Sequence, residues 1–174
     1  LGLFLQAVDG SQPADRLTKP DRGESHIPYS WRAHRLLFDV RKGNEFTLWT
    51  VSLEDRKAAP VEGTRSSAPT NAMFSPDGRW VAYTIGPPGS TKLYVQPYPP
   101  TGAKYQLFLK ENDAAYGAMW SPDGNELLYI PRAGALEAVT VTTSPSFAFG
   151  NPVGIPRRFV VSFAASRREY GITP

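Results

Sequence analysis

Cysteine is absent from the 174-residue sequence, and only two histidines are present, His26 and His34. The absence of cysteine excludes disulfide bonds, a catalytic thiolate and cysteine-based metal sites. No hydrophobic run approaches the ~20 residues of a membrane-spanning helix, so this segment is not expected to insert into a membrane. The net charge is only +3, and Lys and Arg are scattered rather than gathered in a stripe. Nucleic acid is therefore not expected as a partner.

The periodicity of amphipathic helices is also missing. Apolar residues do not recur at positions i, i+3, i+4 and i+7 over any window of helical length, so almost no helix is expected. The sequence is instead rich in turn-forming residues, with 15 Gly and 17 Pro, and 12% of it is aromatic. Many short strands need many turns, and aromatic side chains suit packing between sheets. An all-β fold is therefore predicted.

The tetrapeptide Ser-Pro-Asp-Gly occurs twice, at Ser75, Pro76, Asp77 and Gly78 and again at Ser121, Pro122, Asp123 and Gly124. The aromatic residues before it, Phe74 and Trp120, are 46 residues apart. A degenerate copy at 29–38 keeps the aromatic residue and the serine but has Trp-Arg-Ala in place of Pro-Asp-Gly. Repetition at a period of about 20–50 residues marks a repeat protein.

A second pattern repeats in step with the tetrapeptide. Runs rich in β-branched and aromatic residues, which predict strands, begin at Leu3, Leu48, Leu93 and Leu136 and so recur after 45, 45 and 43 residues. Ser-Pro-Asp-Gly predicts a hairpin turn, because proline presets φ, aspartate accepts backbone hydrogen bonds and glycine adopts positive φ. Each unit then has four strands, a to d, which is typical of a β-propeller blade.

The repeat places the strands along the chain. We expect strand a at 72–74 and 118–120, strand b at 80–84 and 126–130, strand c at 93–98 and 136–141, and strand d near 105–108 and 158–161. The expected organisation is strands c and d of an incomplete blade at 1–26, complete blades at 27–70, 71–116 and 117–164, and strand a of a next blade at 165–174. Because propellers need about 4–8 blades to close, we expect part of a longer propeller, or self-association of two chains into one ring.

The repeat resembles the PD40, or WD40-like, propeller family, which includes the propeller of the periplasmic TolB protein. The stretch from Trp120 to Val141, followed by 147–152, is most similar to the propeller tails of bacterial serine/threonine protein kinases. This resemblance implies a binding or scaffold module for protein or peptide partners, in a signalling tail or a TolB-like scaffold. It also favours a periplasmic or extracytoplasmic location.

The candidates for chemistry are few. The two histidines are expected in solvated loops, away from any Gly-x-Ser-x-Gly motif, which the sequence lacks. The acid pairs Glu54-Asp55 and Glu111/Asp113 are interpreted as solvated charges. Asp77 and Asp123 occupy the same position in two repeats. A turn is needed in every blade, whereas an active site is needed only once, so both aspartates are interpreted as turn residues. We therefore expect no catalytic residue, no cofactor and no metal site, and interpret the chain as non-enzymatic.

Propeller geometry indicates where a partner would bind. The d–a and b–c loops are expected to share one face, opposite the Ser-Pro-Asp-Gly hairpins. An arginine- and tyrosine-containing rim on that face would suit a peptide or an anion. The candidate residues of this rim are Arg22, His26, Arg41, Arg65, Tyr116 and Arg132. Trp31, in the degenerate turn, is a further exposed candidate.

Two alternatives remain open from the sequence. The chain could be the gating propeller of a prolyl-oligopeptidase-type serine peptidase, whose catalytic triad would lie in sequence outside this chain. It could also be a carbohydrate-active propeller with its site in the central channel. A Gly-x-Ser-x-Gly motif in flanking sequence would favour the first alternative, and oligosaccharide binding would favour the second.

Overall fold

The computed structural model describes residues 1–111 and 113–156, which form strands and turns and contain no helix. All strand pairs are antiparallel. The strands are β1 (Phe4–Leu5), β2 (Asp15–Arg16), β3 (Glu24–Arg32), β4 (Arg35–Lys42), β5 (Glu45–Ser52), β6 (Ala58–Pro60), β7 (Met73–Phe74), β8 (Trp80–Ile85), β9 (Lys92–Pro97), β10 (Tyr105–Gln106), β11 (Tyr116–Trp120), β12 (Glu126–Ile130), β13 (Glu137–Thr142), β14 (Ala148–Phe149) and β15 (Val153–Gly154). The all-β prediction is confirmed.

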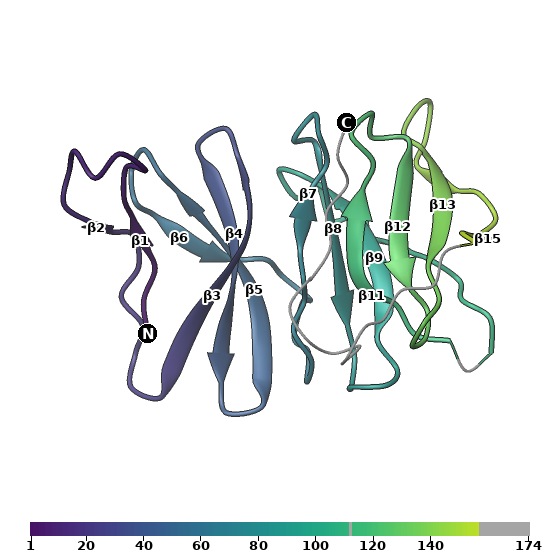
Figure 1. Ribbon diagram of the computed structural model, residues 1–174, viewed down its shortest axis with the longest axis horizontal. Coiled ribbons are helices and arrows are strands. Elements are labelled where there is room, and N and C mark those ends of the chain that lie inside the picture. Colours follow the sequence, from purple (N-terminus) through teal and green to yellow (C-terminus); the bar gives the residue numbers. More distant parts are fainter. Residues whose placement is uncertain (112, 157–174) are drawn as a thin grey trace.

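The strands build three blades in sequence order. Their strand orders are β3-β4-β5-β6, β7-β8-β9-β10 and β11-β12-β13-β14, and β1 and β2 form a separate two-stranded sheet. Figure 1 shows these sheets following one another along the molecule from the N-terminus. The first strands of the blades meet, since β7 contacts both β3 and β11. This is the four-stranded antiparallel propeller arrangement that the repeat predicted.

Two expected boundaries fall inside strands. Strand β3 begins at Glu24, because Glu24 pairs with Lys42 at the far end of β4, so the blade starts before the expected position 27. Strand β11 begins at Tyr116, which pairs with Ile130, rather than after it. In both places, pairing with the neighbouring strand lengthens the strand beyond the repeat motif. The motif alone does not predict this extension.

The outer edge of the third blade differs from the expectation. Both β14 and β15 pair with β13, and they occupy the position expected for strand d. Pro152 lies between them, and its missing N–H interrupts a continuous ladder. The expected strand at 158–161 and the expected next strand at 165–174 lie outside the described residues.

The degenerate copy of the motif forms a shorter hairpin. Arg32 pairs with Arg35, so only Ala33 and His34 connect β3 to β4. Ala33 adopts a φ of 47°, in the left-handed region that is unfavourable for an L-residue with a β-carbon. Trp31 on this hairpin is 53% exposed, as predicted. Loss of Pro-Asp-Gly has therefore changed the turn and left the strand pairing intact.

The core lies between neighbouring blades. Each strand b contributes side chains to the clusters on both faces of its blade. Val81 and Tyr83 of β8 pack into the cluster shared with the preceding blade, whereas Ala82 packs into the cluster shared with the next one. Leu36 and Phe38 of β4 similarly face the β1–β2 sheet. Successive strand side chains point to opposite faces, so a blade packed on both faces needs the continuous apolar runs seen in strand b.

Candidate binding site

The b–c and d–a loops meet at one end of the molecule, as predicted. The loops after β4, β6 and β8 enclose a pocket of about 500 Å³, here called the loop pocket. It is lined by Lys42, Asn44, Glu45, Arg65, Ser66, Ser67, Gly86 and Pro87. The first six of these residues belong to the first complete blade and the last two to the second. The pocket therefore exists only because two blades are packed side by side.

Ser66 holds the three loops together. Its backbone N–H and carbonyl exchange hydrogen bonds with Phe46, at 2.9 and 2.8 Å. Its hydroxyl donates to the Gly86 carbonyl at 3.1 Å and accepts the Gly86 N–H at 3.2 Å. The same oxygen accepts the Ala68 N–H at 3.1 Å. Because one residue satisfies several backbone groups, the pocket wall has a defined shape before any partner binds.

The charged side chains around the loop pocket are mostly basic. The Arg65 guanidinium lies 3.4 Å from the Glu45 carboxylate, and the Arg65 side chain is 79% exposed. Arg41 donates to the Gly43 carbonyl at 2.9 Å and lies over the Phe46 ring at 5.6 Å. Lys42 pairs with Glu24 at 3.4 Å. Lys42 and Arg65 thus line a pocket that contains one acid, Glu45, and Arg41 precedes Lys42 in the chain.

The structure separates the other predicted rim residues. Arg22 is exposed in the turn before β3, and Arg132 pairs with Asp113 at 2.9 Å away from the loop pocket. Tyr116 is not a rim residue: it is buried on β11 and packs with Ala114, Ile130 and Leu136. Its apparent loop position came from placing the strand boundary after residue 116.

His26 is not a solvated loop residue either, because it lies half-buried on β3. Its ring packs on Phe38 at 5.1 Å, and its Nδ1 lies 2.7 Å from Thr18 Oγ1. Thr18 Oγ1 also accepts the Leu3 N–H at 3.0 Å, so this hydroxyl joins His26 to the first residues of the chain. Burial lowers the pKa of His26, and the nearby Glu24 partly offsets that effect.

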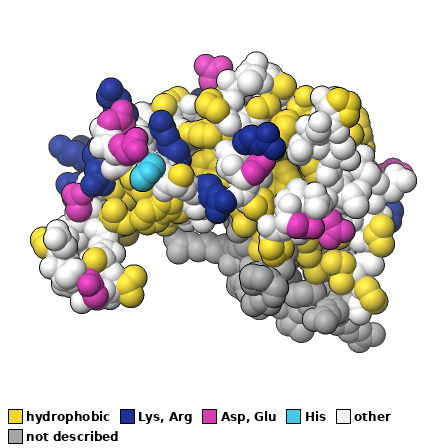
Figure 2. Space-filling view, turned by 90° about the horizontal axis from the view of Figure 1, so that it is seen from above, with side chains coloured by type: hydrophobic (Ala, Val, Ile, Leu, Met, Phe, Trp, Pro, Cys, Tyr) yellow, Lys and Arg dark blue, Asp and Glu magenta, His cyan; other side chains and the backbone are white. Residues whose placement is uncertain are grey.

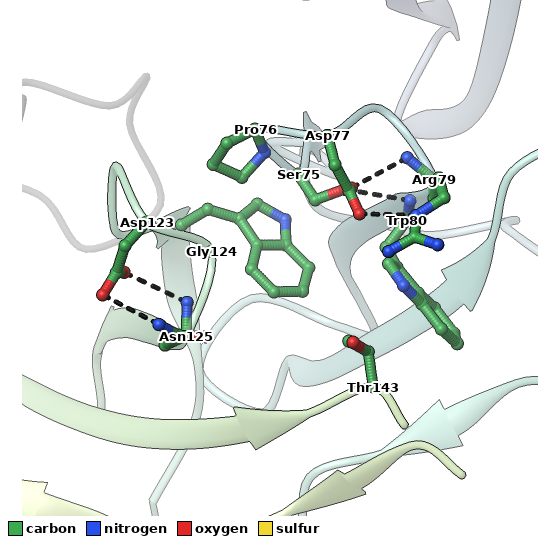
Figure 3. A pocket seen from close by; sticks show the side chains of 10 residues that line it. Ser75, Pro76, Asp77, Arg79, Trp80, Asp123, Gly124, Asn125 and Thr143 are labelled. Atoms are coloured by element: carbon green, nitrogen blue, oxygen red, sulfur yellow. Dashed lines mark hydrogen bonds and ion pairs between the residues drawn. The ribbon is translucent and has the colours of Figure 1, made fainter. Parts of the chain in front are cut away.

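The two Ser-Pro-Asp-Gly hairpins lie at the opposite end, at the top of Figure 1, and enclose a second pocket of about 440 Å³, the hairpin pocket (Figure 3). The Asp77 carboxylate accepts the Ser75 hydroxyl, the Arg79 N–H at 3.0 Å and the Arg79 Nε at 2.7 Å. Asp123 repeats this pattern with Ser121 and Asn125. The predicted turn role of both aspartates is confirmed.

Glycine ends each tetrapeptide because the turn requires a positive φ there. Gly124 has a φ of 76°, which favours glycine. A β-carbon at Gly124 would lie 3.5 Å from Pro76 of the neighbouring hairpin, an ordinary van der Waals contact. Gly78, with a φ of 74°, has the Arg32 side chain in the corresponding place, at 3.3 Å. Successive hairpins therefore pack against one another, and the repeat stabilises contacts between blades as well as its own turn.

We expect Asp77→Asn to lower the free energy of unfolding by about 1 kcal/mol at pH 7. Partial burial opposes ionisation, but the hydrogen bonds from Ser75 and Arg79 prevail and lower the pKa of Asp77 to about 2. The folded-state pKa lies below the unfolded value, so the stabilisation is present above about pH 4 and is lost as the pH falls through about 2. The magnitude is discounted because Asp77 is 44% exposed.

Urea denaturation at several pH values measures this effect. The difference between wild type and Asp77→Asn should shrink from pH 7 towards pH 2. The control is Glu62→Gln, at an exposed acid without an ion-pair partner in residues 1–111 and 113–156, which should change stability by less than ~0.5 kcal/mol at pH 7. If Asp77→Asn lowers the free energy of unfolding by the same amount at every pH, the electrostatic explanation is wrong.

Figure 2 looks onto the hairpin end. Charged side chains of both signs are densest over the end built from β3–β6, and hydrophobic side chains cover much of the remainder.

Across the described part of the chain, no group of three or more His, Asp or Glu side chains is placed to hold a metal ion. No helix in that part is long and apolar enough to cross a membrane.

Comparison with solved structures decides the fold. The chain superposes on TolB from Acinetobacter baumannii with a TM-score of 0.63 and 18% identity, over 85% of this chain and 36% of that one. The fold is that of a TolB-like β-propeller. Putative TolB from Agrobacterium tumefaciens matches with a TM-score of 0.63 and 12% identity, over 88% of this chain and 55% of that one.

Propellers of peptidases match as well. The β-propeller domain of the trilobed protease from Pyrococcus furiosus gives a TM-score of 0.57 and 16% identity, over 78% of this chain and 44% of that domain. The chain thus spans between about a third and about half of these proteins. No protein-family model and no curated protein matches the sequence. At these identities the likeness is one of fold.

Proposed function

We propose that this propeller segment is a non-enzymatic module that binds an acidic segment of a protein or peptide through the loop pocket. The observation that carries the proposal is the pocket wall itself, built from loops of two blades and held by the hydrogen bonds of Ser66. A wall that is already ordered lowers the entropic cost of binding. The exposed Arg65 and its basic neighbours favour a partner of opposite charge.

The PD40 resemblance supports the same proposal at a finer level. Its repeat, around Trp120 to Val141, is similar to the propeller tails of bacterial serine/threonine kinases. We therefore propose a sensory or scaffold role outside the cytoplasm, in which the propeller binds a partner and another part of the protein responds. The wider rim, including Arg22 and Arg132, would contribute long-range attraction rather than direct contacts in the pocket.

The test is a selection of peptides on the purified chain, followed by affinity measurement of the enriched sequences. We expect the enriched peptides to be acidic and their affinity to fall with added salt. Arg65→Glu should weaken binding by about tenfold or more, because it replaces attraction by repulsion at the pocket edge.

Lys57→Glu is the matched control. It makes the same charge reversal in the loop between β5 and β6, at the hairpin end, where the Lys57 side chain is 84% exposed. It should leave peptide affinity within about twofold of wild type. Equal weakening by both variants would show only a general charge effect, and an unchanged affinity in Arg65→Glu would reject the loop pocket as the binding site.

A further inference from the structure

A third pocket lies where the β1–β2 sheet meets the first complete blade. This junction pocket has a volume of about 280 Å³. It shares no lining residue with the hairpin pocket. Its apolar lining is Leu17, Phe38, Val40, Trp49 and Ala58. Its polar lining is Thr18, Lys19, Asp21, Glu24, His26 and Arg56. Concave sites with an apolar wall and a few polar groups are the usual form of small-molecule sites.

The apolar wall is held in place by aromatic packing. Phe38 is 1% exposed, and its ring centroid lies 5.1 Å from that of His26 and 6.4 Å from that of Trp49. Leu17, from the segment after β2, also lines the pocket and is 6% exposed. The volume is just below the range of about 300–1,000 Å³ typical of ligand pockets. The occupant must therefore be compact, with one ring or one branched chain.

The charges at the pocket divide into paired and unpaired groups. Glu24 pairs with Lys42, and Arg56 pairs with Asp15. Lys19 and Asp21 also line the pocket, and neither has an ion-pair partner among the residues that the structure describes. A ligand entering here therefore meets one unpaired cation and one unpaired anion. In the sequence, only Pro20 lies between Lys19 and Asp21, and its ring restricts the backbone between them.

His26 adds an imidazole nitrogen that can form a hydrogen bond. Its Nδ1 is hydrogen-bonded to Thr18 Oγ1 at 2.7 Å, and no hydrogen-bond partner for Nε2 is found within residues 1–111 and 113–156. The pocket thus combines a small aromatic wall, one imidazole nitrogen without a partner among the described residues, and one unpaired charge of each sign. These features complement a zwitterion that carries an apolar side chain.

We propose that the junction pocket binds a free α-amino acid with an apolar side chain. The side chain would pack on Phe38 and Trp49, and the carboxylate and ammonium groups would contact Lys19 and Asp21. Such a ligand would join the segment after β2 to the first complete blade and stabilise their packing. The site is separate from the loop pocket, so this proposal is independent of the partner-binding role.

The test is an NMR titration of the ¹⁵N-labelled full chain with L-phenylalanine up to about 10 mM, a concentration that detects millimolar affinity. We expect saturable shifts confined to the amides of residues 17–26, 38–40, 49 and 56–58. N-acetyl-L-phenylalaninamide, which has the ring but neither charge, and glycine, which has the charges but no side chain, should each bind at least about tenfold more weakly. Equal binding of the uncharged analogue, or no saturable shift, would overturn the proposal.

Two neighbouring alanines on β6 provide matched variants. Ala58 lines the pocket and Ala59 does not, and both are exposed on the same strand. Ala58→Phe should fill the pocket and weaken L-phenylalanine binding by at least about tenfold, whereas Ala59→Phe should not change it. Asp21→Asn, at an exposed position, tests the charge without filling the pocket and should also weaken binding by at least about threefold. Wild-type affinity in both Ala58→Phe and Asp21→Asn would place the ligand elsewhere.

Discussion

Replacing Asp39 with alanine is expected to lower the free energy of unfolding by about 3 kcal/mol. Asp39 lies on β4 and is completely buried. Its carboxylate accepts the Thr70 N–H at 2.9 Å, the Thr70 hydroxyl at 2.6 Å and the Tyr29 hydroxyl at 2.8 Å. Alanine would leave both Thr70 donors buried without this acceptor, and each unsatisfied donor costs about 1–3 kcal/mol.

Two comparisons separate lost hydrogen bonds from lost charge. Burial raises the pKa of Asp39, and the hydrogen bonds from Thr70 partly offset that rise, so the ionised group itself is not favourable here. Asp39→Asn keeps one oxygen acceptor and should therefore lose only about half as much stability as Asp39→Ala. Urea denaturation at pH 7 measures both. Equal losses of stability in the two variants would show that the negative charge, and not the acceptor oxygens, stabilises the contact of β4 with Tyr29 and Thr70.

Replacing Trp120 with alanine is expected to lower the free energy of unfolding by about 4 kcal/mol, the usual range for a buried aromatic residue. Trp120 is 2% exposed and belongs to the cluster between the second and third complete blades, with Leu127 and Tyr129. Its indole N–H donates to the Met73 carbonyl of the preceding blade at 3.3 Å. The substitution would leave a cavity between blades and remove this hydrogen bond.

Trp31 provides the control, because it stands at the hairpin of the degenerate copy and is 53% exposed. Trp31→Ala should lower stability by less than about 1 kcal/mol, even though its indole donates to the nearby Ala33 carbonyl. Chemical denaturation followed by circular dichroism measures both variants without relying on tryptophan fluorescence. A small loss in Trp120→Ala would mean that the packing between these blades contributes little to the stability of the fold.

Most strands were predictable because the sequence repeats in phase. Strand b of the third blade was predicted at 126–130 and observed at Glu126–Ile130. The turn chemistry of Ser-Pro-Asp-Gly was also readable, since proline, aspartate and glycine act locally. The outer strand of the third blade was not, because its position beside β13 depends on a tertiary pairing that Pro152 divides into two short strands.

The binding residues were predictable only in part. Propeller phase predicted that the b–c and d–a loops meet at one end, and Arg65 lines the loop pocket that they form. It could not tell that Tyr116 is buried or that His26 faces Thr18, because the two lie at strand starts where the register decides burial. Asp39 was missed as well. The only signal was a single acid inside the apolar run of strand b, at the position that Thr84 occupies in the next blade.

The sequence by itself therefore determined the repeat period, the blade as the structural unit and the hairpin turns, because each depends on residues close together in the chain. Only the tertiary structure decided how Ser66 joins loops of two blades, which acids and tyrosines are buried, and where the junction pocket opens. These features arise from contacts between blades, where the partners are tens of residues apart and local patterns carry no information about their pairing.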